Sequence, residues 1–74
     1  MTQDQLAQAV LADLRITGIK RPKLLALKDN RSFSVVLTGL NIINNSTQIA
    51  AIDVNICEYI HVPMNCVVEF KEIS

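Results

Sequence analysis

Apolar residues near the N-terminus recur with the period of a helix. Leu6, Val10 and Leu14 are each four residues apart and form one stripe, with Leu11 beside it. We therefore predict a helix over residues 3–15, whose stripe packs on the remainder of the chain.

Local signals mark both ends of this helix. Thr2 and Gln5 have the spacing of a capping box, in which each side chain accepts a hydrogen bond from a backbone N–H of the other residue. Gly18 can adopt the left-handed conformation that ends helices, and Pro22 biases the preceding residue away from helical angles. The helix should thus end before residue 20.

From residue 23 onwards the pattern is typical of strands. We predict four of them, over residues 23–28, 31–40, 48–60 and 66–71. Turn-forming residues separate them, first Asp29-Asn30 and then Asn44-Asn45-Ser46.

Alternation within each strand predicts which residues share a face. The first such set is Phe33, Val35 and Leu37; the second is Ala50, Ile52, Val54, Ile56 and Ile60; the third is Cys66, Val68 and Phe70. Glu58 interrupts the second apolar face, so we expect the strand over residues 48–60 to bend or bulge there.

A helix followed by strands with short connections indicates an α+β fold. We predict a single domain over residues 1–74, with the N-terminal helix followed by a four- or five-stranded antiparallel meander. Strands of ten or more residues can bend enough to curl the meander into a small barrel. An open sheet backed by the helix is the alternative.

The composition favours self-association. Half of the 74 residues are apolar and only 19% are charged, and so small a domain buries little core by itself. Four apolar residues are expected to face outward and to form an oligomer interface: Val36, Leu40, Val67 and Ile73. The last strand contains no proline, so its edge can pair with a neighbouring copy.

The sequence also bears on the compartment. The first residues are polar and lack a basic segment, and no apolar run approaches the about 18 residues of a membrane span. We expect a cytoplasmic protein without a membrane partner. Cys57 and Cys66 are then expected to be buried free thiols rather than a disulfide.

Catalytic and metal-binding chemistry has few candidate residues. His61 is the single histidine, the two cysteines lack the paired spacing of zinc ligands, and the two glycines form no phosphate-binding loop. We therefore expect no enzymatic activity, no metal and no cofactor.

The charges are segregated along a chain whose net charge is zero. Six of the seven basic residues lie in one window: Arg15, Lys20, Arg21, Lys23, Lys28 and Arg31. Asp29 is the one acid there, which leaves the window at +5. The window is either a solvated surface or a rim that binds phosphate backbone, and Tyr59 is the aromatic residue best placed to stack on a base.

Several segments resemble the Sm-like family, in particular its bacterial RNA-chaperone branch. Lys20-Arg21-Pro22 and Leu24 to Asn30 are similar to that family's first strand and hairpin, and Leu40-Asn41 to an apolar residue followed by aspartate. Tyr59-Ile60-His61 resembles the segment that contacts uridine, and Cys66-Val67-Val68 the closing strand. The resemblance implies a helix followed by five strands of a bent barrel, assembly into rings, and RNA binding.

The chain departs from the family pattern at three places. Val35 or Val36 occupies the position of a glycine in the second strand, Ile60 replaces the uridine-contacting lysine, and the stretch from Asn41 to Tyr59 is several residues longer. These departures bear most on RNA specificity.

Two hypotheses follow. The first is a small non-catalytic assembly or adaptor protein that associates with itself, and with another protein if it acts as an adaptor. The second is an Sm-like RNA-binding protein that uses Lys20, Arg21 and Lys23 together with Tyr59 and His61.

Overall fold

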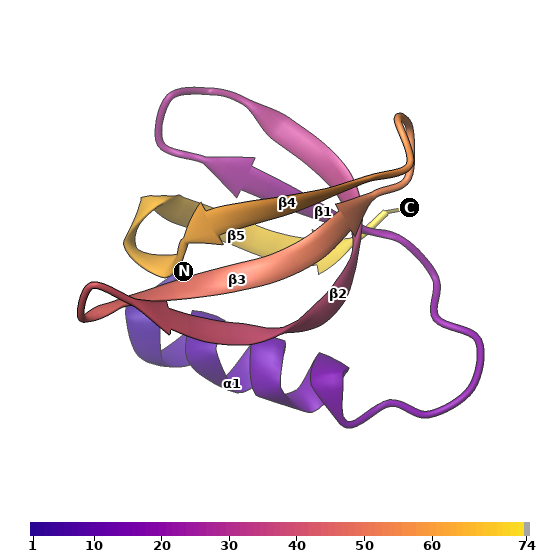
Figure 1. The fold of residues 1–74 in the computed structure, drawn as a ribbon, viewed down its shortest axis with the longest axis horizontal. Helices are drawn as coiled ribbons and strands as arrows, with labels where there is room; N and C mark the ends of the chain where they lie inside the picture. Colours follow the sequence, from indigo (N-terminus) through magenta and orange to yellow (C-terminus); the bar gives the residue numbers. More distant parts are fainter. Residues whose placement is uncertain (74) are drawn as a thin grey trace.

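The computed structural model describes residues 1–73 and shows one helix followed by a five-stranded antiparallel sheet (Figure 1). The elements are α1 (Gln3–Leu14), β1 (Lys23–Leu27), β2 (Ser32–Ile43), β3 (Ser46–Asp53), β4 (Glu58–Pro63), the 3-10 helix η1 (Met64–Cys66) and β5 (Val67–Glu72). The strand order is β4-β3-β2-β1-β5. The predicted α+β class is confirmed.

The predicted capping box starts α1. The backbone N–H of Gln5 donates to Thr2 Oγ1 over 3.1 Å, and the backbone N–H of Thr2 donates to Gln5 Oε1 over 3.0 Å. Gly18 has a φ of 87°, as its sequence position indicated, and so helps to turn the chain toward β1.

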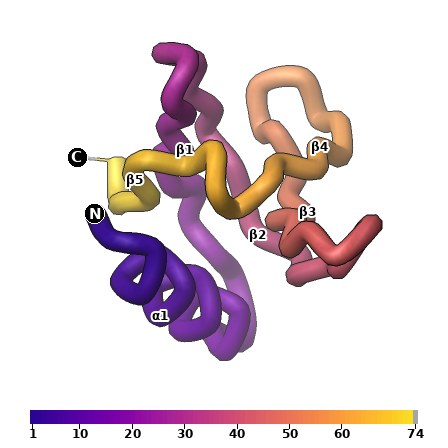
Figure 2. Tube along the Cα trace, turned by 90° about the vertical axis from the view of Figure 1, so that its left-hand side faces the viewer, coloured from indigo at the N-terminus to yellow at the C-terminus, as the bar shows by residue number. Residues whose placement is uncertain are grey.

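The apolar stripe of α1 packs on β2 and β5 (Figure 2). Leu6 and Val10 are fully buried, Leu14 is half-buried against the same core, and Leu11 is exposed. The predicted docking of the helix is therefore confirmed, with its strongest contacts in the first two turns.

Tight turns set the register of the strands. Asn30 has a φ of 70° between β1 and β2, and Asn44 and Asn45 have φ values of 51° and 63° between β2 and β3. Asparagine tolerates this left-handed region, and two such residues in succession match the twist of a hairpin. Both predicted turns are present.

Strand β2 bends strongly along its 12 residues (Figure 1). Its pairing with β3 shifts between Leu37 and Gly39, so that Thr38 is an extra residue in β2. Such a bulge bends and twists a strand. The sheet curls but does not close, since β4 and β5 are its two edges.

The predicted single strand over residues 48–60 is wrong. The chain turns between Asp53 and Glu58, and Cys57 adopts a φ of 55° there. Asp53 is buried, and its carboxylate accepts the N–H of Asn55 over 2.9 Å, which ends β3 in a local turn. Val54 and Ile56 on either side of Asn55 hid this turn in the sequence, because they continue the alternation of a strand.

The predicted face shared by Ala50, Ile52, Val54, Ile56 and Ile60 is not a face of one strand, because Ile56 lies in the turn and Ile60 in β4. Within β3, Ile49, Ala50 and Ala51 are buried, whereas Ile52 is half-buried. Apolar residues occupy four successive positions, Ile49 to Ile52, so alternation alone could not identify the inner face.

The phase of β5 differs from the prediction as well. Val67 was expected to face outward, but it is buried beside Leu27 in the core. The pairing with β1 passes directly from Val67 to Glu69, which leaves Val68 as an exposed bulge residue. Because of this extra residue, Val67 and Phe70 both point inward although three positions separate them.

The core lies between α1 and the concave side of the curled sheet (Figure 2). Its members are Leu6, Val10, Leu25, Leu27, Val35, Leu37, Ile49, Ala51, Val62, Val67 and Phe70. Across residues 1–73, no helix has both the length and the apolar character required to cross a bilayer.

Candidate functional site

Two of the basic residues predicted to form a phosphate-binding rim are held by a buried carboxylate. Asp13 lies in the last turn of α1 and is 4% exposed. Its Oδ1 is 2.9 Å from Lys23 Nζ, and its Oδ2 is 3.5 Å from Lys20 Nζ. The side chains of Lys20 and Lys23 retain only 17% and 19% of their exposure.

Further contacts hold both ammonium groups. Lys20 Nζ donates to the carbonyl oxygen of Leu37 over 3.4 Å, and Lys23 Nζ lies 5.5 Å from the centre of the Phe70 ring. Arg21, between them, is exposed. Of the three predicted rim residues, Arg21 therefore presents the most accessible charge.

Tyr59 and His61 are exposed on β4, two residues apart and thus on one face of that strand. Strands β2 and β3 lie between β4 and β1, which carries Lys23. The structure brings Tyr59 and His61 together and separates them by two strands from Lys23, whereas His61 lines a cavity together with Lys28 and Arg31 of the same basic window.

The predicted interface residues have different surroundings. Val36 and Leu40 are half-buried, and Leu40 packs against the core, so neither faces fully outward. Ile73 is exposed as predicted. The sequence pattern did not identify several other large apolar residues that are exposed and could belong to an interface. They are Ile16, Ile19, Ile42, Ile43, Ile56 and Val68.

The two edges of the sheet are lined differently. Strand β4 exposes Tyr59, and β5 exposes Val68 at its bulge. Beside Val68, Lys71 Nζ lies 2.7 Å from Glu69 Oε1, and the hydrogen bond from Lys71 lowers the pKa of the Glu69 carboxyl. Within residues 1–73, the outer edges of β4 and β5 pair with no other strand.

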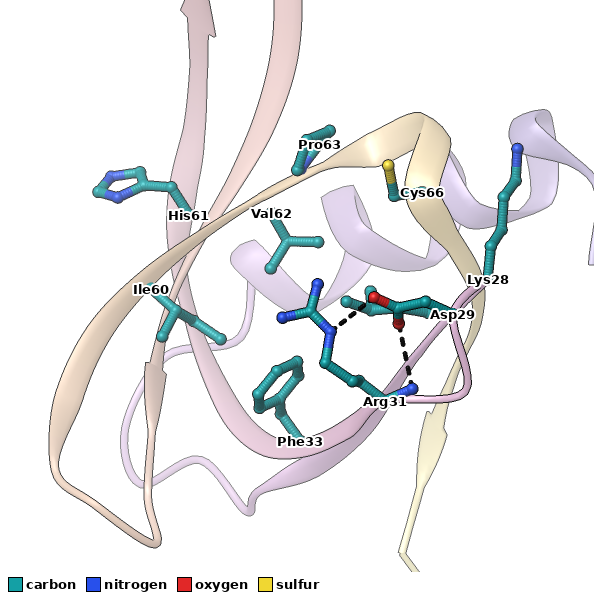
Figure 3. A pocket seen from close by; sticks show the side chains of 10 residues that line it. Lys28, Asp29, Arg31, Phe33, Ile60, His61, Val62, Pro63 and Cys66 are labelled. Atoms are coloured by element: carbon teal, nitrogen blue, oxygen red, sulfur yellow. Dashed lines mark hydrogen bonds and ion pairs between the residues drawn. The ribbon is translucent and has the colours of Figure 1, made fainter.

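An open cavity of about 610 Å³ lies between the β1–β2 hairpin and the segment formed by β4 and η1 (Figure 3). It is lined by Leu27, Lys28, Asp29, Arg31, Phe33, Ile60, His61, Val62, Pro63 and Cys66. The close view shows the side chains of Phe33, Ile60 and Val62 around the guanidinium of Arg31.

Arg31 is fixed at this cavity by Asp29. Arg31 Nε donates to Asp29 Oδ2 over 2.7 Å, and the backbone N–H of Arg31 donates to Asp29 Oδ1 over 3.1 Å. The backbone hydrogen bond, aided by the guanidinium, lowers the pKa of Asp29 below its ordinary value. The guanidinium carbon also lies 6.0 Å from the centre of the Phe33 ring.

This pair was counted in the sequence only as part of the basic window. A signal was present, because an aspartate two residues before an arginine across a hairpin turn can accept both its backbone and side-chain N–H groups. The apolar walls could not be foreseen, because β4 reaches Arg31 only through the curl of the sheet.

The cysteines are both free, but they are not the buried pair that was expected. Cys57 is exposed in the β3–β4 turn, and Cys66 is half-buried beside the cavity. In the part of the chain that the structure describes, no three histidine, cysteine or acidic side chains gather into a group that could hold a metal ion.

Comparisons with protein-family models, with curated proteins and with solved structures give no match.

Proposed function

We propose that this chain is a small non-catalytic assembly or adaptor protein that acts through protein–protein contacts, beginning with association between copies of itself. One observation carries the proposal, namely that within residues 1–73 the curled sheet ends in two edge strands, β4 and β5, each paired on one side only. The open side of an edge strand presents a row of backbone N–H and C=O groups that another chain can complete.

Side chains beside the β5 edge support pairing with another copy. Val68 is 41% exposed and Ile73 is 52% exposed, and no proline lies within Val67–Glu72. The one charged pair there, Lys71 with Glu69, neutralises itself within the strand. Charged side chains commonly protect exposed edges, and here they leave Val68 unprotected.

Identical chains can join by their edges in two ways. Pairing β5 of one copy with β4 of the next repeats head to tail and gives a ring when the rotation between copies closes, whereas pairing β5 with β5 gives a two-fold dimer. Either arrangement covers apolar surface that a chain with 19% charged residues otherwise exposes. In solution we expect at least twice the monomer mass of 8.2 kDa.

We predict that Val68→Lys converts the assembly into monomers. The lysine would place a charge in the interface at a residue that does not pair with β1, so the fold itself should be retained. Light scattering at micromolar concentration should show the mass fall from a multiple of 8.2 kDa to that value.

Ile19→Lys is the matched control. Ile19 is 98% exposed in the connection between α1 and β1, outside both edge strands, and should tolerate the same change without loss of mass. A folded monomer for the unmodified chain, or equal dissociation of both variants, would contradict the proposal.

A second candidate function is Sm-like RNA binding. The sequence resemblance implies it, and it is supported by the exposed position of Tyr59, at 71%, next to His61 on one face of β4. An exposed aromatic ring can stack on an unpaired base. In this case Arg21 would supply the phosphate contact, since Lys20 and Lys23 are mostly buried and form ion pairs with Asp13.

If this second function holds, Tyr59→Ala should weaken binding to single-stranded RNA about tenfold, because it removes a stacking surface. Tyr59→Phe keeps the ring and should bind nearly as well. Arg21→Gln removes one phosphate contact. The slope of the logarithm of the binding constant against the logarithm of the salt concentration should therefore become less steep by about 0.7. Fluorescence anisotropy over a salt series measures all three. Absence of binding at low salt, or equal losses for Tyr59→Ala and Tyr59→Phe, would exclude RNA stacking at this site.

A further inference from the structure

We infer that the cavity between the β1–β2 hairpin and β4 binds a small organic monoanion, specifically a carboxylate carried on an apolar body. Its volume of about 610 Å³ falls within the range of ligand pockets, which is about 300–1,000 Å³. The cavity shares β4, including His61, with the surfaces discussed above, but its cation Arg31 belongs to the β1–β2 hairpin.

The walls of the cavity suit an apolar body. Leu27, Phe33, Ile60, Val62 and Pro63 line it from two directions, the hairpin and β4. Leu27 and Val62 also belong to the hydrophobic core, which makes the floor part of the rigid fold. A ligand that enters it would contact side chains already held in place.

One cation is positioned to bind the anionic group. Arg31 Nε is bound by Asp29, and the two terminal nitrogens point into the space beside the apolar side chains of Ile60 and Val62 (Figure 3). Within residues 1–73, neither terminal nitrogen has a protein hydrogen-bond partner. Two parallel N–H donors fit the two oxygens of a carboxylate, and their aim is fixed before binding.

Other polar residues around the cavity are oriented differently. The side chains of Lys28 and His61 extend away from the guanidinium of Arg31 (Figure 3). Arg31 is therefore the one lining cation whose donors face the apolar walls.

The local charge favours a monoanion over a dianion. Asp29 lies 2.7 Å from Arg31 Nε and offsets the charge of the guanidinium, so Lys28 alone adds positive charge near the mouth. The Asp29 carboxylate would repel a dianionic phosphate, and the positive charge nearby is too small to offset this repulsion. The lowered pKa of Asp29 keeps this carboxylate ionised at neutral pH.

Octanoate is a suitable probe, because it joins one carboxylate to an apolar chain. Titration of the full chain at pH 7, followed by calorimetry and by NMR, should give a Kd of about 0.1–1 mM, which for ten non-hydrogen atoms lies between the efficiencies of drug-sized ligands and of the smallest ligands. The shifted signals should include the methyl groups of Ile60 and Val62 and the Nε–H of Arg31.

Arg31→Gln should weaken octanoate binding about tenfold or more, because it replaces a charged bidentate donor with a neutral amide. Arg31 is 66% exposed, so the variant should remain folded. Arg21→Gln removes the same charge from an exposed residue outside the cavity and should leave the affinity unchanged. Equal effects of the two substitutions would overturn the assignment of Arg31.

A series of head groups on the same chain tests the class of ligand. Octylammonium should not bind, and octyl phosphate should bind more weakly than octanoate. Tighter binding of octyl phosphate would overturn the carboxylate assignment. Binding of octanoate to monomeric Val68→Lys but not to the assembled chain would show that a neighbouring copy occupies the cavity, and would equally overturn the proposal.

Discussion

Leu6→Ala should remove about 2–5 kcal/mol from the free energy of unfolding, the usual cost of truncating a fully buried leucine. Leu6 is 1% exposed in the second turn of α1 and belongs to the core cluster. Its side chain fills the space between the helix and the sheet, and the rest of the core is too small to collapse around the lost methyl groups. We expect a cavity rather than a repacked core.

The size of the domain makes this loss severe. A chain of this length has a total stability of about 4–11 kcal/mol, so Leu6→Ala removes a large fraction of it. Each kcal/mol corresponds to about 4–8 °C in Tm for a domain of this size, and the variant should melt at least 8 °C lower. Thermal unfolding must be compared at equal protein concentration, because association raises Tm by mass action.

Leu11→Ala provides the control within the same helix. Leu11 is exposed, so its truncation should change the stability by no more than about 0.5 kcal/mol. If Leu6→Ala were as mild as Leu11→Ala, α1 would be a detached arm in solution, and the packing on β2 and β5 would be wrong.

The helix was predictable because its signals are local. The capping box needs only Thr2 and Gln5, and the stripe of Leu6, Val10 and Leu14 needs only the helical period. The hairpin turns were predictable for the same reason, since Asn30, Asn44 and Asn45 carry the positive φ values themselves.

The strands were harder to place because their apolar residues do not alternate cleanly. Bulges at Thr38 and Val68 each change the phase of a strand, and neither residue type is diagnostic of a bulge. The turn after Asp53 contains two apolar residues, Val54 and Ile56, that continue the strand pattern, and it uses Cys57 at positive φ, a conformation that cysteine rarely adopts. Facing and register therefore depended on tertiary contacts that alternation does not encode.

The candidate sites depend on contacts across the chain to an even greater extent. The sequence did not single out Asp13, yet its carboxylate forms ion pairs with two of the three residues predicted to bind phosphate. Arg31 was one of six basic residues in a window, and only the curl of the sheet places it beside Ile60 and Val62. Charge counting along a sequence cannot separate cations that a fold neutralises from those that it leaves available.

Asp13→Asn should also destabilise the fold, by about 2–3 kcal/mol. Loss of one partner from a buried ion pair costs about 3–5 kcal/mol, and the residual exposure of Lys20 and Lys23 reduces this figure. The amide preserves the shape of the side chain but removes the charge between two ammonium groups. Those groups would then repel each other at the junction of α1, β1 and the connection between them.

The origin of this loss can be tested by removing the cations as well. Asp13→Leu combined with Lys20→Met and Lys23→Met replaces the whole cluster with apolar side chains, and it should recover most of the stability lost in Asp13→Asn. Asp4→Asn, at an exposed residue in the first turn of α1, should cost no more than about 1 kcal/mol through its interaction with the helix dipole. Chemical denaturation at equal protein concentration measures all of these variants. If the triple variant is no more stable than Asp13→Asn, the uncompensated lysine charges are not the cause, and Asp13 acts through packing at the end of the helix.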